Sequence, residues 1–200
     1  RGELNISLSS RSVRALQRMQ RYLDQDQLLT VEFTTCDEYF FALRSAARAV
    51  AIAGVRGVMF LAAAVSDFYA RDKATHKIQS SEGPLTLVLQ QTPKLLRTLR
   101  DEWCPRALCV SFKLETDSKI LLRKAQRAIT KYGMDAVVAN LLQTRYDQVT
   151  IVTRAATRAH RRNSPETEIE AVIVEEIAAL HDAALAEAKD ADPGDAPSGA

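Results

Sequence analysis

A continuous apolar run from Gly57 to Val65, reading GVMFLAAAV, sets the class of fold. The run is far shorter than the ~20 residues that cross a bilayer as a helix. It also lacks the alternation of polar and apolar residues that a half-exposed strand shows. Such a run is typical of a parallel strand buried on both faces. A strand of this kind needs helices packed on both sides, so we expect an α/β protein.

The rest of the chain alternates between helical and strand-like patterns. We predict helices over residues 10–25, 35–50, 93–103, 118–132 and 167–186. We predict further strands over residues 28–34, 85–89, 107–112, 135–140 and 149–153, and a loop over residues 68–83. This order favours a doubly wound, mostly parallel, Rossmann-like sheet with helices on both faces and a short edge extension near residues 84–90. We expect one domain over residues 1–188 and a disordered tail over residues 189–200.

Local signals mark the ends of three helices. Thr35 followed by Glu38 forms a capping box. Thr92 with a proline after it is a typical helix start, so Thr92 is the expected N-cap. Asp117 is the expected cap of the helix over residues 118–132, and Gly133 fits the left-handed position past its end.

Composition excludes several classes of function. The net charge is only +2, and Lys and Arg are interleaved with acids, so we expect neither nucleic acid nor a membrane surface as a partner. Three cysteines, Cys36, Cys104 and Cys109, have no metal-ligand spacing, which favours reduced thiols in a cytoplasmic protein. The first residue is Arg1 and no secretory signal follows it, so we expect the chain to be processed or cut from a longer one.

No familiar catalytic motif is present. Neither GxGxxG nor GxxxxGK occurs, which weakens the hypothesis of a dinucleotide-dependent oxidoreductase. Polar residues do follow the predicted strands, however: Asp67, Lys113 and Asn140. Singly, Asp67 could cap a turn, Lys113 could be solvated and Asn140 could satisfy loop backbone groups. Ligands, however, bind open α/β sheets at the carboxyl ends of the strands. Small side chains at 62–64 would let a ligand approach the backbone, so the three residues together predict a site.

Four motifs in a fixed order resemble those of the eukaryotic-type phosphopantothenoylcysteine synthetases (phosphopantothenate–cysteine ligases). They are AAAVSDFY at 62–69, HKIQSS at 76–81, SFKLETD at 111–117 and VVAN at 137–140, within a similarity over about residues 28–180. The resemblance implies a ligase of coenzyme A synthesis that joins 4'-phosphopantothenate to L-cysteine through an acyl-nucleotide intermediate. It also implies ATP rather than CTP as co-substrate, Mg²⁺ and a homodimer.

The resemblance also implies roles for individual residues. Ala63, Ala64 and Asp67 match substrate-binding positions, Phe112 and Asn140 match nucleotide-binding positions with Lys113 beside them, and Lys77 matches a catalytic lysine of a mobile lid. Asp67 could instead hold the metal ion, whose ligands the sequence leaves unknown.

Residues 1–27 do not match the family's first strand, phosphate turn and Asn-Phe-Ser motif, so we expect residues 1–200 alone to be inactive. The alternative hypothesis is a non-catalytic regulatory or binding protein of the same fold.

Overall fold

The computed structural model describes residues 9–70, 76, 85–164 and 167–191. It divides into two compact units, one up to Ala42 and one from Leu43 onward. The prediction of one domain over residues 1–188 stays a prediction. The last helix extends to Ala191, and the rest of the expected tail lies outside the described residues. Among the described helices, none combines the length and apolar composition that a bilayer span requires.

The first unit contains helix α1, Ser10–Asp24, and the start of helix α2, Cys36–Ile52. The prediction of a helix over residues 10–25 is confirmed, and the Ser9 hydroxyl caps it by accepting the Ser12 amide at 3.1 Å. The prediction of a strand over residues 28–34 is wrong, because these residues have no secondary structure. A strand needs a neighbour for its amides and carbonyls, and no pairing in the described part of the chain includes this segment.

The capping box at the start of α2 is confirmed. Glu38 accepts hydrogen bonds from the Thr34 and Thr35 amides at 2.7 and 3.0 Å, and its own amide donates to the Thr35 hydroxyl at 3.2 Å. The hydrogen bond from the Thr34 amide is the largest of the effects that lower the pKa of Glu38 from 4.5 to about 2.

This lowered pKa predicts how the start of α2 responds to acid. Because the pKa is depressed in the folded state, the contribution of Glu38 is complete above pH 4.5 and is lost as the pH falls towards 2. An NMR titration of the Thr34 and Thr35 amide protons should show a midpoint near pH 2, and Glu38→Gln should abolish that transition. A midpoint near pH 4.5 would show that the capping box does not hold the carboxylate in solution.

The second unit is built on a five-stranded sheet with the order β1-β4-β5-β6-β7. Its strands are Val58–Leu61, Leu108–Glu115, Ala136–Leu141, Gln148–Thr153 and Thr157–Arg161. Strands β1, β4 and β5 run parallel, while β6 and β7 add antiparallel pairings. The predicted α/β class is therefore confirmed.

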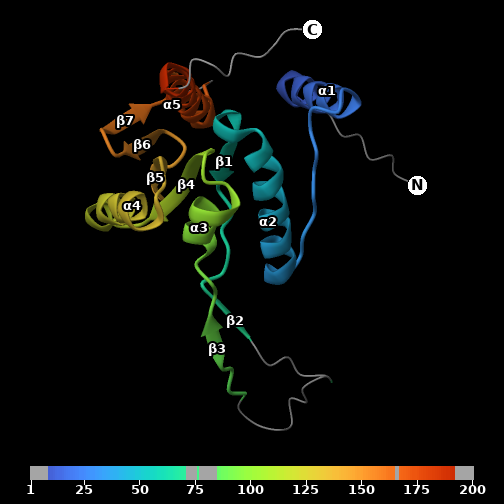
Figure 1. The fold of residues 1–200 in the computed structure, drawn as a ribbon, viewed down its shortest axis with the longest axis vertical. Coiled ribbons are helices and arrows are strands. Elements are labelled where there is room, and N and C mark those ends of the chain that lie inside the picture. Colours follow the sequence, from blue (N-terminus) through green and yellow to red (C-terminus); the bar gives the residue numbers. More distant parts are fainter. Residues whose placement is uncertain (1–8, 71–75, 77–84, 165–166, 192–200) are drawn as a thin grey trace. The chain divides into compact units, whose positions relative to one another are not determined.

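Helices cover both faces of this sheet (Figure 1). One face packs against α2, α3 (Leu95–Thr98), a π-helical turn (Leu99–Trp103) and α4 (Ser118–Tyr132). The other face packs against α5, Ile169–Ala191, through Ile169, Ile173 and Ile177. Successive residues of the two central strands alternate between the two cores, because side chains of a strand alternate between faces. Strands β4 and β5 are therefore buried on both sides, as a parallel strand requires.

Two predictions about strands need correction. The strand expected over residues 57–65 is only Val58–Leu61, and Phe60 keeps 42% of its surface exposed. Phe60 stays exposed because β1 lies at the edge of the sheet and pairs only with β4 in the described residues. Strand β7 was not predicted, since its sequence, TRAHR, is polar and mostly exposed, and it forms only because β6 offers it a partner.

A two-stranded ribbon, here called the β2–β3 ribbon, replaces the expected edge extension. Phe68–Ala70 pairs antiparallel with Leu89–Gln91 in a sheet of its own, which lies below the five-stranded sheet in Figure 1. Residues 68–70 are therefore strand rather than loop, and the strand expected at 85–89 starts later. Most of the remaining predicted loop lies outside the described residues.

The helix ends agree with the sequence at one place and differ at another. Helix α4 begins and ends as predicted, with Asp117 accepting the Lys119 amide at 2.8 Å and Gly133 at φ 67°. Thr92 does not cap α3, whose N-cap is Lys94. The Thr92 amide donates instead to the carbonyl of Asp67, the residue before β2, at 2.9 Å.

Candidate functional site

Two cavities lie where the parallel strands β1, β4 and β5 end. They are on opposite faces of the sheet, because the residues of β4 and β5 that line them alternate. Phe112 borders both cavities. The carboxyl ends of parallel strands are the usual ligand position in open α/β sheets, so this edge is the candidate site.

The first, here called the apolar cavity, has a volume of about 450 Å³ and lies on the α5 face. Its lining residues are Phe60, Ala62, Phe112, Asn140, Arg145, Tyr146, Ile169, Glu170, Ile173 and Val174. The rings of Phe60 and Phe112 meet edge to face with centroids 6.1 Å apart. Flat apolar walls with few polar groups are typical of a small-molecule site.

Asn140 is the buried polar residue in the lining of this cavity. The residue is 5% exposed, and its side-chain oxygen Oδ1 is buried without a hydrogen-bond partner in the described structure. A buried acceptor without a partner costs about 1–3 kcal/mol. A ligand that donates a hydrogen bond to Oδ1 would recover that cost, so Asn140 stays a candidate for ligand recognition.

The loop between β5 and β6 forms the rim. The Arg145 guanidinium lies over the Tyr146 ring at 4.3 Å and donates to the Leu142 carbonyl at 2.7 Å and to the Tyr146 hydroxyl at 2.8 Å. These contacts fix the cation beside the cavity mouth. This rim was not predicted, because the loop carries no recognised motif.

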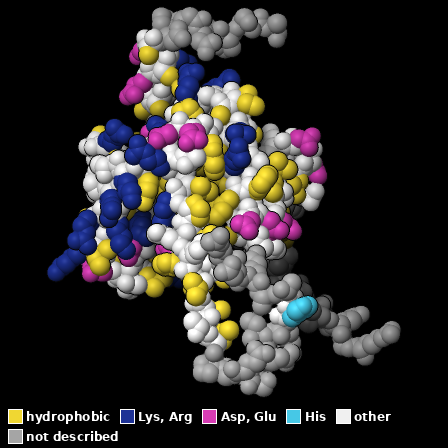
Figure 2. Space-filling view, turned by 60° about the horizontal axis from the view of Figure 1, so that its bottom comes forward, with side chains coloured by type: hydrophobic (Ala, Val, Ile, Leu, Met, Phe, Trp, Pro, Cys, Tyr) yellow, Lys and Arg dark blue, Asp and Glu magenta, His cyan; other side chains and the backbone are white. Residues whose placement is uncertain are grey.

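The second, here called the cationic cavity, has a volume of about 430 Å³ and lies on the α4 face. Five cationic side chains line it, together with Ser111, which is 6% exposed. These cations are Lys94, Lys113, Lys124, Arg127 and Lys131. Figure 2 shows Lys and Arg side chains gathered at the left of the view, the side on which α4 lies in Figure 1.

Two carboxylates are held among these cations. Asp67 forms an ion pair with Lys94, and the hydrogen bond from Lys94 is the main cause that lowers the pKa of Asp67. Glu115 pairs with both Lys124 at 2.7 Å and Lys113 at 3.0 Å, and the hydrogen bond from Lys124 is the first cause that lowers its pKa. Both carboxylates are therefore ionised at neutral pH.

The structure brings some predicted site residues together and separates others. Phe112 and Asn140 line the same cavity, and their nucleotide-binding roles stay predictions. Lys113 lies on the opposite face, in the cationic cavity. Ala63 and Ala64 are exposed after β1, in the lining of neither cavity. Asp67 approaches the cationic cavity through Lys94. Lys77 lies outside the described residues.

Sequence reasoning missed most of the cationic cavity. Lys124, Arg127 and Lys131 recur at spacings of three and four, which places them on one face of α4. That spacing was a usable signal. No sequence pattern indicated a role for Lys94, because its contact with Asp67 joins residues that are distant in sequence.

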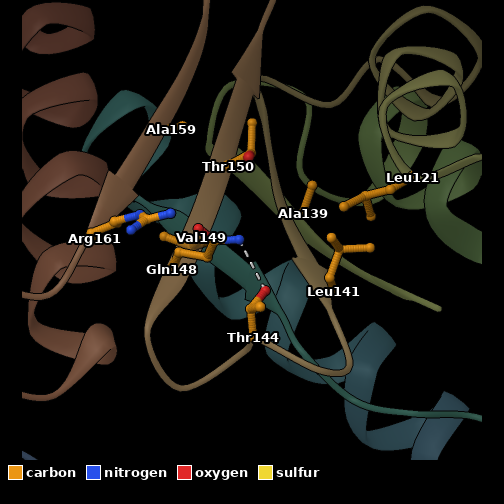
Figure 3. A pocket seen from close by; sticks show the side chains of 9 residues that line it. All are labelled: Leu121, Ala139, Leu141, Thr144, Gln148, Val149, Thr150, Ala159 and Arg161. Atoms are coloured by element: carbon orange, nitrogen blue, oxygen red, sulfur yellow. Dashed lines mark hydrogen bonds between the residues drawn. The ribbon is translucent and has the colours of Figure 1, made fainter. Parts of the chain in front are cut away.

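Other candidate features are weaker. A third cavity, of about 250 Å³, lies against β5, β6 and β7, where Gln148 donates to the Thr144 hydroxyl at 3.1 Å (Figure 3). No predicted site residue lines it. Burial raises the pKa of the Cys104 and Cys109 thiols, so these unpaired cysteines are packing groups. The described residues contain no group of three or more His, Cys, Asp or Glu side chains that could hold a metal ion.

Comparison with known proteins gives consistent matches. Residues 23–181 match the family described as "DNA/pantothenate metabolism flavoprotein C-terminal domain". The chain is 44% identical over 169 residues to phosphopantothenate–cysteine ligase 2 of Oryza sativa subsp. japonica, covering 84% of this chain and 52% of that protein. It is 40% identical over 175 residues to the human phosphopantothenate–cysteine ligase, covering 84% and 56%.

A solved structure agrees with these matches. A mutant of Cab2 in complex with phosphopantothenate-cysteine superposes with a TM-score of 0.79 at 36% identity, covering 88% of this chain and 60% of that one. The chain thus spans about half the length of the curated relatives it matches.

Proposed function

The chain belongs to the family of the DNA/pantothenate metabolism flavoprotein C-terminal domain, and on that premise we propose that it forms the nucleotide- and substrate-binding part of a phosphopantothenate–cysteine ligase. The observation that carries the proposal is the pair of cavities, one apolar and one cationic, at the carboxyl edge of the parallel strands. A ligase that activates a carboxylate with a nucleotide needs both an apolar slot for a base and cations for phosphates.

The proposed reaction has two steps. The phosphopantothenate carboxylate attacks the α-phosphorus of ATP, so that an acyl-adenylate forms and pyrophosphate leaves. The cysteine amine then attacks the acyl carbon, loses a proton and releases AMP as the amide forms. Fixed cations near the phosphates stabilise the charge that develops in the first step, which is usually a large contribution to catalysis.

The apolar cavity suits the base of the nucleotide. Phe60 and Phe112 supply aromatic surface, and Asn140 Oδ1 can accept a hydrogen bond from an exocyclic amine. Adenine and cytosine both carry such an amine, so ATP in preference to CTP remains a proposal drawn from the FKLET motif.

The described residues contain no evident binding site for Mg²⁺. Asp67 is already paired with Lys94, whose charge opposes a second cation at the same carboxylate. Mg²⁺ commonly binds through substrate phosphates and few carboxylates. We therefore assign it no ligand in this chain.

A homodimer is part of the proposal because the β2–β3 ribbon carries apolar side chains that are exposed in the part of the chain that the structure describes. Phe68 and Leu89 are each more than half exposed, and Val88 just before the second strand is 74% exposed. Contiguous apolar surface of this kind usually marks an interaction site. The alternative of a non-catalytic binding protein is not favoured, since the curated relatives are named as ligases.

The test is a ligation assay with the full-length protein. We expect release of pyrophosphate that depends on phosphopantothenate, cysteine and ATP together, with phosphopantothenoylcysteine identified by mass spectrometry. Phe112→Ala should reduce turnover at limiting ATP because it removes one wall of the apolar cavity. Phe41→Ala, a substitution of an exposed phenylalanine of α2, is the matched control. No product with any nucleoside triphosphate would reject the proposed function.

A further inference from the structure

We propose that the third cavity, of about 250 Å³ beside β6 and β7, is a separate binding site for a small aliphatic carboxylate, and that Arg161 is the side chain that recognises it. This cavity shares no lining residue with the apolar cavity or with the cationic cavity. The proposal therefore goes beyond the ligase function and does not depend on it.

A row of small side chains across three strands forms the hollow. Ala139 of β5 is the partner of Thr150 of β6, and Thr150 is the partner of Ala159 of β7. Side chains of residues paired in this way lie next to each other on one face of a sheet. Leu121 is the buried α4 residue in the lining, and Leu141, at the end of β5, is a second apolar wall. The cavity therefore suits a short aliphatic group.

Polar side chains follow in the next row. Gln148 of β6 and Arg161 of β7 are also cross-strand partners, and both line the cavity. In Figure 3 the Arg161 side chain reaches from β7 toward Gln148, on the side of the cavity opposite Leu121 and Leu141. Gln148 donates to the Thr144 hydroxyl at 3.1 Å, which leaves the hydrogen of that hydroxyl for an acceptor on a ligand. One side of the cavity is thus apolar and the other donates hydrogen bonds.

Arg161 is a cation without a carboxylate partner. The arginines nearest to it in sequence are paired: Arg158 lies 3.9 Å from Glu176, and Arg162 lies 2.6 Å from Asp147. Across the segments that the structure describes, no hydrogen bond or ion pair includes the Arg161 side chain. Its charge at the mouth of the cavity is therefore available to an anion.

Charge and size select the class of ligand. A guanidinium donates two parallel hydrogen bonds to a carboxylate, so one arginine matches one carboxylate. The described lining contains no acidic side chain that would hold an ammonium group of the same ligand. The volume is below the roughly 300–1,000 Å³ of sites for drug-sized ligands, and at ~30 Å³ per water it holds on the order of eight to ten non-hydrogen atoms. These limits describe a short-chain aliphatic monocarboxylate.

The test starts from two probes of the same shape. Isovalerate carries the carboxylate, and isovaleramide replaces it with a neutral amide. An NMR titration of the full-length protein at constant ionic strength follows the methyl resonances of Leu121, which lines the cavity. We expect a saturable shift with isovalerate and binding of isovaleramide that is at least roughly tenfold weaker, because the hydrogen bonds to an ionised acceptor are the stronger ones.

Three variants then test the site itself. Arg161→Gln should weaken isovalerate binding at least roughly tenfold, whereas Arg154→Gln, in the turn between β6 and β7 and outside the lining, should weaken it less than about twofold. Ala159→Leu, at an exposed position of β7, fills the hollow without changing the charge and should abolish the shift. Because the Arg161 side chain has no partner within the described ranges, Arg161→Gln should keep the wild-type unfolding transition.

Four results would overturn the proposal. Equal losses in the two arginine variants would reduce the effect to general electrostatic attraction. Equal binding of isovalerate and isovaleramide would remove the carboxylate from recognition, and unchanged binding in Ala159→Leu would place isovalerate elsewhere. Tighter binding of L-cysteine than of isovalerate, at the same Leu121 methyl groups, would make the cavity a site for an amino acid instead. Because these titrations need no turnover, a failed ligation assay would leave their result intact.

Discussion

Replacing Asp135 with alanine is expected to lower the free energy of unfolding by about 2–3 kcal/mol. Asp135 accepts two hydrogen bonds from the Arg100 guanidinium, at 3.1 and 3.2 Å, and a third from the Cys109 amide at 2.8 Å. Arg100 also donates to the Ala107 carbonyl at 2.7 Å. The carboxylate thus joins the helix before β4, the start of β4 and the start of β5.

Removal of Asp135 leaves its partners unsatisfied. The Arg100 side chain is only 25% exposed, so its charge would be left partly buried without a counterion. The Cys109 amide, in a residue that is fully buried, would lose its acceptor. A buried group that loses its partner costs more than the pair contributes when intact.

The control is Asp101→Ala, which also removes a carboxylate paired with an arginine. Its partner, Arg97, is one helical turn away, and both side chains are more than half exposed. Exposed pairs of this kind contribute ~0.3–0.5 kcal/mol. Urea unfolding of both variants in the full-length protein measures the difference. Equal, small losses would show that the network around Asp135 is not needed for stability.

Replacing Asn140 with leucine is expected to have opposite effects on binding and on stability. The side chains are similar in size, and leucine removes the buried oxygen that has no partner. The free protein should become more stable by roughly 1 kcal/mol, because an unsatisfied buried acceptor is costly. ATP affinity should fall roughly tenfold to a hundredfold, which corresponds to about 1–3 kcal/mol, since the ligand loses its acceptor.

Two measurements decide this prediction. Calorimetric titration gives the ATP affinity, and thermal unfolding without nucleotide gives the stability. Asn163→Leu, at an exposed position before α5, should change neither. If Asn140→Leu binds ATP normally, the apolar cavity is not the base site. If it binds poorly and is also much less stable, the lost affinity reflects damage to the fold.

Local chemistry explains which elements the sequence predicts well. Helix α4 is bounded by Asp117 and Gly133, and each acts through backbone groups within a few residues. The capping box of α2 likewise acts through backbone groups within a few residues. The strands β4 and β5 were recognisable because burial on both faces leaves an apolar run. Phe112 and Asn140 could be placed at one edge because parallel strands end together.

Pairing between distant segments was decided only by the tertiary structure. Residues 28–34 have strand-like composition but no partner, while the polar β7 is a strand because β6 pairs with it. The contacts Asp67–Lys94 and Arg100–Asp135 join residues that are 27 and 35 positions apart in the sequence, so no local sequence pattern predicts them. The division of the candidate site into an apolar and a cationic cavity arises in the same way. It depends on which helix covers each face of the sheet. The alternation of side chains along a strand shows that there are two faces, but it does not show which helix packs on each.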